Sequence, residues 1–185
     1  MAATESTMMP LGTIAPAFDL PEVMGGRVTS ADCADARALL VMFICNHCPY
    51  VKHVRAELGA IGRDYEGKDV AIVAISSNDA AAYPADSFER MREEKEAVGY
   101  PFPYLYDETQ EVARAYGAAC TPDFFLFDGS RRLVYRGQLD DSRPGSGRPV
   151  TGADLRSALD AVLAGRAVPG EQRPSLGCSI KWKPT

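Results

Sequence analysis

Two short apolar segments with a helical segment between them constrain the fold more than any other feature of this 185-residue chain. Residues 39–44, LLVMFI, and residues 70–75, VAIVAI, are continuous apolar runs, which are typical of strands buried on both faces. Between them, Val51, Val54 and Leu58 recur at spacings of three and four, which predicts an amphipathic helix. A strand, a helix and a strand in this order predict a right-handed parallel βαβ unit.

The rest of the chain adds helices and strands around this unit, and no linker divides it. We therefore expect one α/β domain over residues 1–185, a sandwich around a mixed sheet, with an extended tail on the surface over 168–185. The charged side chains of 86–96 are expected to form a solvated helix face. The further elements are expected at 13–30 (hairpin), 86–98 (helix), 102–106 (short edge strand), 107–117 (helix), 124–128 and 133–137 (second hairpin) and 154–165 (last helix).

Charge and composition exclude several classes of function. The net charge is −5 and there is no basic block, so we expect no nucleic acid and no membrane surface as a partner. No apolar run approaches the length of a membrane span. The N-terminus, MAATESTMMPLG, has neither a basic start nor an apolar stretch of the secretory type, which favours a cytoplasmic protein. In a reducing compartment, a close cysteine pair is more often catalytic or metal-binding than a structural bridge.

The segment ICNHCPYVKH places such a pair, Cys45 and Cys48, at the end of a predicted strand and the start of a predicted helix. A helix N-terminus offers unpaired N–H groups and a partial positive charge, which both stabilise a thiolate. Pro49 suits the first helical turn, and His47 adds positive charge when protonated. We expect Cys45 to be the exposed nucleophile, with a pKa below the free value of about 8.5, and Cys48 to be the resolving thiol.

Two other interpretations of the pair stay open at this stage. The cysteines could simply pack at a strand–helix junction, or Cys45 and Cys48 could bind a metal together with Cys120 or Cys178. Zinc sites usually show a second ligand pair at similar spacing, whereas the remaining cysteines are isolated, so we expect neither a metal nor an organic cofactor. Cys178 is a candidate third redox thiol. Cys120 is expected to be a packed loop residue, and Cys33 is expected to take no part in the reaction.

Together these segments resemble the thioredoxin superfamily. The C-N-H-C sequence at a strand–helix junction and the Thr121–Pro122 pair before FFLFD are similar to thioredoxins. The stretches LGTIAPAFDL with GGRV, and YDETQEVARAYGAACTPDFFLFD, resemble the redoxin branch, which includes the AhpC/TSA peroxiredoxins. The resemblance implies a thioredoxin-like three-layer sandwich with an N-terminal β-hairpin extension. It also implies that Thr121–Pro122 is a cis-proline loop facing Cys45, Cys48 and His47, and that these residues form the catalytic site.

The sequence departs from both groups at informative positions. Peroxiredoxins carry a threonine or serine three residues before the reactive cysteine, where this chain has Cys45 or Met42. They also carry an arginine before the strand that FFLFD resembles, where this chain has residues 120–123, CTPD. Thioredoxins carry a buried acid in the strand before the CxxC motif, and LLVMFI has none, which leaves His47 as a candidate proton acceptor.

The sequence therefore favours a thiol–disulfide oxidoreductase that uses the Cys45/Cys48 dithiol. A peroxiredoxin-like thiol peroxidase is the first alternative, and a non-enzymatic metal-binding or redox-sensing module is the second. The expected partners are a protein or small-molecule disulfide or peroxide as substrate and a thiol as electron donor, and a homodimer stays open.

Overall fold

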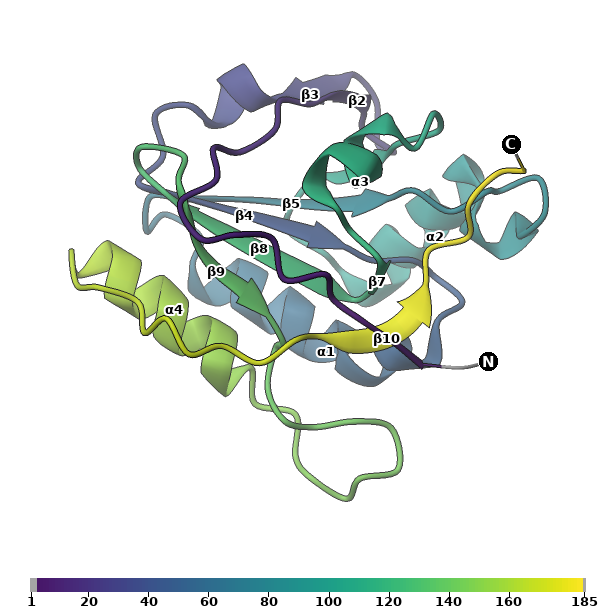
Figure 1. The fold of residues 1–185 in the computed structure, drawn as a ribbon. Coiled ribbons are helices and arrows are strands. Elements are labelled where there is room, and N and C mark those ends of the chain that lie inside the picture. Colours follow the sequence, from purple (N-terminus) through teal and green to yellow (C-terminus); the bar gives the residue numbers. More distant parts are fainter. Residues whose placement is uncertain (1–2, 185) are drawn as a thin grey trace.

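A computed structural model of the chain describes residues 3–184, and its core is a five-stranded mixed sheet (Figure 1). The two strands of the predicted βαβ unit are parallel neighbours, and a β-hairpin joins the sheet antiparallel to the first of them. This arrangement confirms the expected α/β class with a mixed sheet. From one edge to the other, the strands are β6 (Tyr104–Tyr106), β5 (Val70–Ser76), β4 (Ala38–Phe43), β8 (Asp123–Asp128) and β9 (Leu133–Gly137).

Helices cover both faces of this sheet, which makes three layers. Because successive side chains of a strand point to opposite faces, Leu40 and Met42 of β4 join one apolar cluster, and Val41 and Phe43 join the other. The first cluster contains the buried sides of α1 (Pro49–Asp64), α4 (Ala153–Leu163) and Met91 of α2 (Phe88–Val98). The second contains α3 (Glu111–Tyr116), which lies across the sheet from α1 (Figure 1).

The predicted N-terminal hairpin consists of β2 (Asp19–Pro21) and β3 (Arg27–Thr29), which pair antiparallel and are followed by a 3-10 turn, Ser30–Cys33. Gly25 and Gly26 both have positive φ, +120° and +77°, which side-chain-bearing residues rarely adopt. The hairpin contributes Leu20 to the apolar cluster on the α3 side, so it extends that layer rather than the central sheet.

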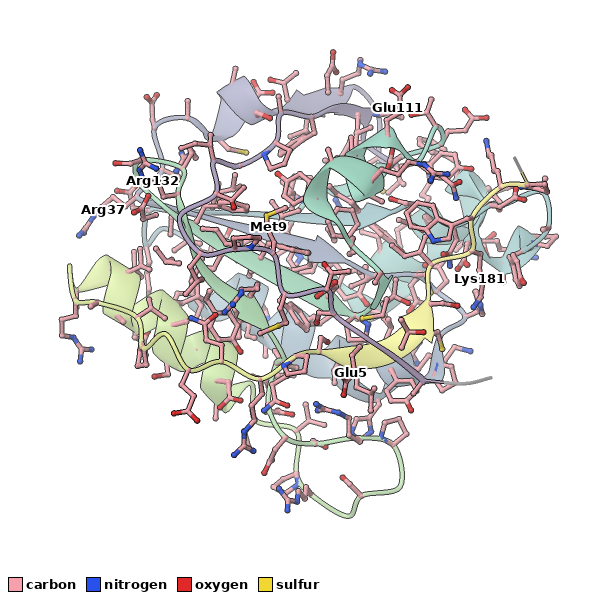
Figure 2. All side chains as sticks on the ribbon, in the orientation of Figure 1. Glu5, Met9, Arg37, Glu111, Arg132 and Lys181 are labelled. Atoms are coloured by element: carbon pink, nitrogen blue, oxygen red, sulfur yellow. The ribbon has the colours of Figure 1, made fainter. Side chains whose placement is uncertain are left out.

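The C-terminal tail is extended, as expected, but it is part of a second sheet and is not merely laid on the surface. Its strand β10 (Leu176–Ser179) pairs antiparallel with β1 (Ala3–Glu5) on one side and with β7 (Cys120–Thr121) on the other. Figure 2 shows Glu5 on β1 beside this strand and Lys181 just beyond its end. Cys178 on β10 is buried. Strand β10 therefore lies between β1 and the segment that precedes β8.

The described residues include no helix that is both long enough and apolar enough to cross a membrane.

Candidate functional site

Cys45 and Cys48 lie between strand β4 and helix α1, as predicted. Cys48 immediately precedes the helix, and Pro49 occupies its first turn, so the unpaired N–H groups of that turn are close to the thiols. Both residues are nevertheless buried, with 2% of Cys45 and 0% of Cys48 exposed. The expectation of an exposed Cys45 is therefore wrong. Residues distant in the sequence cover this helix N-terminus, and periodicity within one segment cannot reveal them.

The first segment that covers the thiols is the loop at Thr121–Pro122, whose peptide bond is cis, as the resemblance implied. The Thr121 hydroxyl oxygen lies 3.3 Å from the Cys45 sulfur. The Thr121 carbonyl oxygen lies 3.2 Å from the Cys48 sulfur and accepts a hydrogen bond from that thiol. One residue therefore contacts both thiols, which confirms that this loop faces the dithiol.

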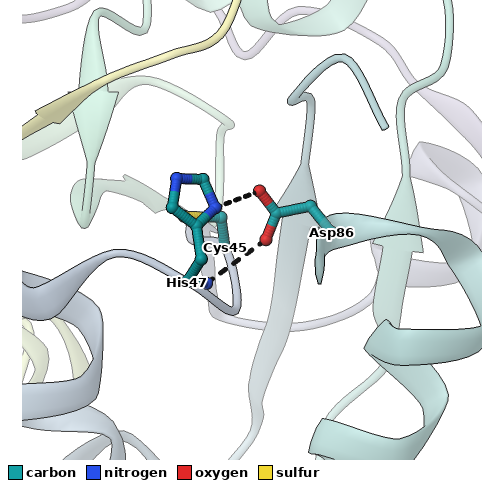
Figure 3. Close-up of side chains that lie close together, drawn as sticks. All are labelled: Cys45, His47 and Asp86. Atoms are coloured by element: carbon teal, nitrogen blue, oxygen red, sulfur yellow. Dashed lines mark hydrogen bonds and ion pairs between the residues drawn. The ribbon is translucent and has the colours of Figure 1, made fainter. Parts of the chain in front are cut away.

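The second group that covers the thiols is His47. Its ring is held by the carboxylate of Asp86, a residue that the sequence analysis placed on a solvated helix face. The His47 Nδ1 atom lies 2.5 Å from an oxygen of Asp86, and the His47 backbone N–H donates to the same carboxylate at 3.3 Å (Figure 3). One face of the imidazole stacks on Tyr83, with ring centroids 5.5 Å apart. The side chain of His47 stays 19% exposed, so it forms the outer boundary of the site.

Asp86 is fully buried, which corrects the expectation that it belongs to a solvated helix face. It ends the 3-10 turn Pro84–Asp86, and helix α2 begins only after Ser87. Besides the two His47 groups, its oxygens accept from the Asn46 backbone N–H and the Asn78 amide, both at 2.8 Å. Buried charges persist when they are hydrogen-bonded in this way. The sequence signal was present: a serine after Asp86 is a favoured N-cap, which places Asp86 before the helix.

The same cluster bears on the metal-binding alternative. Cys45, His47 and Asp86 each offer one potential ligand atom, and these atoms all lie within 4.8 Å of one another. The Asp86 oxygens, however, already accept from four protein donors, and Nδ1 of His47 is directed at one of them. A metal ion would have to displace these hydrogen bonds. The cluster therefore fits a role in orienting the imidazole better than a metal site.

The Cys45 and Cys48 thiols differ in pKa, and Cys48 loses its proton more readily. The Cys45 thiol donates to the Cys48 sulfur, and this bond lowers the pKa of Cys48 to about 5 against the opposing effect of burial. The Cys178 thiol and the backbone N–H groups of Val51 and Cys178 add further donors. Ionisation removes the hydrogen bond from the Cys48 thiol to the Thr121 carbonyl but leaves these donors, so Cys48 carries the first negative charge of the pair.

Cys45 shows the opposite behaviour. Its hydrogen bond to Cys48 raises its pKa, and burial and the negative charge of Asp86 raise it further, while the Thr121 hydroxyl opposes them. The low pKa that the sequence analysis expected for Cys45 is therefore not found there, because its hydrogen bond to Cys48, its burial and the charge of Asp86 all disfavour its thiolate. Since the two thiols share one proton, their titration belongs to the pair rather than to either residue.

The remaining cysteines differ in their distance from this pair. Cys178 on β10 lies directly opposite Thr121 and is buried in the same apolar cluster as Cys45 and Cys48. Cys120 is buried, as expected, and its thiol points to the carbonyl oxygen of Pro122 at 3.8 Å. Cys33 lies in the apolar cluster on the other face of the sheet. The structure thus brings Cys178, but not Cys33, to the dithiol.

A second buried carboxyl group, which the sequence analysis did not single out as functional, directly follows the cis-proline. Asp123 is completely buried at the start of β8, and burial raises its pKa to about 7. Its Oδ1 accepts from the Phe124 backbone N–H, whereas its Oδ2 has no hydrogen-bond partner within the described residues 3–184. The only sequence signal was an acidic residue beside an apolar strand.

Comparison with solved structures agrees with this architecture. A crystal structure of an uncharacterized conserved protein from Geobacillus kaustophilus is 60% identical, with a TM-score of 0.98 over 100% of this chain and 98% of that one. The thioredoxin domain of a thiol-disulfide oxidoreductase from Bacteroides vulgatus is 18% identical, with a TM-score of 0.65 over 84% of this chain and 99% of that one. The latter likeness shows a shared thioredoxin-like fold, which confirms the predicted fold class.

The sequence comparisons indicate which branch of this fold the chain represents. A Mycobacterium tuberculosis protein named "Putative peroxiredoxin" is 28% identical over 115 residues, which are 62% of this chain and 68% of that protein. The model of the AhpC/TSA family matches residues 11–136, from the segment before the hairpin to the end of the central sheet. This match covers more than half of the chain, and the chain belongs to the AhpC/TSA family of redoxins.

Proposed function

We propose that the protein is a thiol–disulfide oxidoreductase in which Cys45 attacks the substrate disulfide and Cys48 resolves the mixed disulfide. The observation that carries this proposal is the pair of thiols beneath Thr121, whose hydroxyl oxygen lies 3.3 Å from the Cys45 sulfur and whose carbonyl oxygen accepts from the Cys48 thiol. Exchange needs a thiolate, a second thiol and no cofactor.

The first step uses Cys48 as the internal base. The Cys45 proton passes to the Cys48 thiolate while the Cys45 sulfur bonds to one substrate sulfur, and the substrate S–S bond breaks. The other substrate sulfur leaves as a thiolate. In the second step Cys48 gives its proton to that leaving thiolate and attacks the Cys45 sulfur, which forms the Cys45–Cys48 disulfide and releases the second substrate thiolate. The substrate disulfide gains two electrons and the dithiol loses two.

His47 is proposed to stabilise the leaving thiolate. Asp86 fixes Nδ1 and Tyr83 fixes the ring plane, which leaves Nε2 without a hydrogen-bond partner among residues 3–184. A protonated imidazole held beside Cys45 can neutralise a departing sulfur. Because His47 is the partly exposed member of the cluster, we propose that the substrate reaches Cys45 past this side chain.

Rapid mixing of the reduced protein with oxidised glutathione tests the proposal. We expect one disulfide to be reduced per chain, and Cys45→Ser and Cys48→Ser to abolish this turnover. Cys33→Ser is the matched control, because Cys33 is a buried cysteine on the other face of the sheet, and it should react like the parent. Normal turnover by Cys45→Ser would refute the assigned nucleophile.

A thiol peroxidase is the second candidate, and the Thr121 hydroxyl beside Cys45 favours it. In that reaction a thiolate sulfur bonds to one peroxide oxygen, the O–O bond breaks, water leaves after protonation, and the sulfenic acid condenses with a second thiol. Fast cleavage requires donors that stabilise the leaving oxygen. We expect hydrogen peroxide to react more slowly than a disulfide, and the reverse order together with a large loss in Thr121→Val would reverse this ranking.

A further inference from the structure

Strand β10 holds a third thiol against the dithiol. Cys178 pairs in register with Thr121, and directly opposite residues of antiparallel strands project their side chains to the same face. The Thr121 side chain contacts Cys45, so Cys178 projects toward the dithiol as well. Cys178 is buried in the same apolar cluster as Cys45 and Cys48.

The fold fixes this strand closely over the loop. A Cβ atom at Gly177 would lie 2.0 Å from the carbonyl oxygen of Thr121, so only glycine permits this approach of β10 to β7. The Ser175 hydroxyl donates to the carbonyl oxygen of Pro122, and Ser175 N–H donates to the Ser6 hydroxyl. Beyond the strand, Trp182 packs against the guanidinium of Arg114 at 4.6 Å. Both ends of β10 are thereby anchored.

The order of the three sulfur atoms is the informative feature. Thr121 relates the three thiols, because its hydroxyl oxygen lies 3.3 Å from the Cys45 sulfur, its carbonyl oxygen accepts from the Cys48 thiol, and its partner on β10 is Cys178. Cys48 and Cys178 also shift each other's pKa, so we take Cys48 as the central sulfur. Thiol–disulfide exchange needs this order: an attacking sulfur, a central sulfur and a leaving sulfur. Cys48 is therefore the sulfur to which Cys178 is proposed to bond.

We propose that the oxidised site transfers its disulfide from Cys45–Cys48 to Cys48–Cys178. This proposal rests on the proposed function, because the Cys45–Cys48 disulfide is that reaction's product. The Cys178 sulfur attacks the Cys48 sulfur, the Cys48–Cys178 bond forms, and the Cys45–Cys48 bond breaks. The Cys178 proton passes to the departing Cys45 sulfur. One disulfide replaces another, so no external oxidant or reductant is consumed.

The ionisation of Cys178 is suited to act only after oxidation. Burial raises the pKa of Cys178, and so do its hydrogen bond to Cys48 and the negative charge of Cys48, while Lys181 opposes them. When Cys48 enters a disulfide, its charge and its acceptor role disappear, and Cys178 then loses its proton more readily. In the reduced protein Cys178 is a donor, and in the oxidised protein it becomes an attacking group.

The transfer would assign the reaction with the substrate and the reaction with the electron donor to two different cysteines. The exchange returns Cys45 to the reduced form beneath His47, where the substrate is proposed to enter. The remaining disulfide then lies on β10, where a donor thiol would attack Cys178. The electron donor would thus react at Cys178 on β10, and the substrate at Cys45 before α1.

Timed disulfide mapping tests the transfer. The reduced full-length protein is mixed with one equivalent of oxidised glutathione, quenched with acid at increasing times, alkylated and digested, and the disulfide-linked peptides are quantified by mass spectrometry. We expect Cys45–Cys48 to appear first and Cys48–Cys178 to replace it, with Cys45 recovered in alkylated form. In Cys178→Ala the first disulfide should persist and the second should be lost. Cys120→Ser, one residue from Thr121 on β7, is the matched control and should behave like the parent.

The outcomes separate this inference from the function on which it rests. A Cys45–Cys48 disulfide that forms and stays would overturn the transfer and leave the oxidoreductase intact. If oxidised glutathione is not reduced at all, the proposed function fails. The pairing is then tested in Cys45→Ser oxidised with diamide, where folding is monitored by circular dichroism. A folded variant should yield the Cys48–Cys178 disulfide as its main product, and a folded variant that lacks it would overturn the inference.

Discussion

Asp86 and Asp123 are both completely buried near the thiols, but their surroundings are opposite. The Asp86 oxygens accept from four donors on three residues, which are Asn46, His47 and Asn78. Asp123 has an oxygen without a partner within the described part of the chain, and burial raises its pKa to about 7. A hydrogen-bonded carboxylate can stay charged inside a protein, whereas an incompletely bonded one holds its proton.

This difference assigns different tasks to the two groups. Asp86 fixes the backbone of the Cys45–Cys48 turn and the ring of His47 through its hydrogen bonds. Asp123, at the start of β8 opposite Phe43 of β4, can gain and lose a proton near neutral pH. The thioredoxins' buried acid precedes the CxxC motif on its own strand. Here the titrating acid lies on the neighbouring strand.

The largest effect is expected from Asp86→Ala. The substitution leaves two backbone N–H groups, an amide and an imidazole without their acceptor in a buried site. Removing one partner of a buried charged hydrogen-bond network typically costs roughly 3–5 kcal/mol. We expect a loss of this size in the free energy of unfolding by urea, together with slower reduction of oxidised glutathione.

Glu89→Ala is the control for this variant, because Glu89 is an exposed carboxylate three residues away on α2. Its effect should stay within about 0.5 kcal/mol. An Asp86→Ala protein as stable as Glu89→Ala would show that the four hydrogen bonds do not hold the turn.

Asp123→Asn should change the pH dependence of stability. The folded-state pKa of about 7 exceeds the unfolded value near 4, so between these values the folded state binds more protons than the unfolded state. The stabilisation from this group is complete below about pH 4 and is lost as pH rises through about 7. The free energy of unfolding should therefore fall by on the order of 1.4 kcal/mol per pH unit in that window.

The asparagine variant should lack this contribution while keeping the hydrogen bond to Phe124. The measurement is the difference in unfolding free energy between the parent and Asp123→Asn at several pH values from 4 to 8. A difference that does not depend on pH would mean that Asp123 does not titrate in the folded protein.

Much of the fold could be predicted because its signals are local. The apolar runs at 39–44 and 70–75 and the periodic helix between them appear as β4, β5 and α1, with bounds shifted by one or two residues. The tail shows the limit of such signals. LGCS carries no strand pattern, and it becomes strand β10 because β1 and β7, more than fifty residues away, offer backbone partners.

The candidate site, like the fold, could be predicted from the sequence only where its signals are local. The position of Cys45 and Cys48 at a helix N-terminus and the facing Thr121–Pro122 loop follow from motif and resemblance. Their burial does not, since β10 and Asp86 cover them from elsewhere in the chain. The ionisation was assigned to the wrong thiol for the same reason, because the carboxylate that disfavours a charge on Cys45 was placed on a surface helix.

The smallest expected effect separates the two aspartates by their influence on Cys45. The negative charge of Asp86 raises the pKa of Cys45, whereas Asp123 acts on Cys120. In a Cys48→Ser background the shared proton is absent, so the alkylation rate of Cys45 against pH reports Cys45 alone. Burial and Asp86 should keep its half-point above the ordinary value of about 8.5.

Adding Asp86→Asn to this background should lower the half-point by on the order of one pH unit, since a like charge near the thiolate is removed. Adding Asp123→Asn instead should leave the half-point unchanged, which makes it the matched control for removing a buried carboxylate. Iodoacetamide labelling followed by mass spectrometry of the peptide that contains Cys45 gives both values. Equal half-points in the two variants would mean that Asp86 does not direct the negative charge of the dithiol away from Cys45. Helix α1 alone, with Cys48 as its cap, would then account for the charge on Cys48.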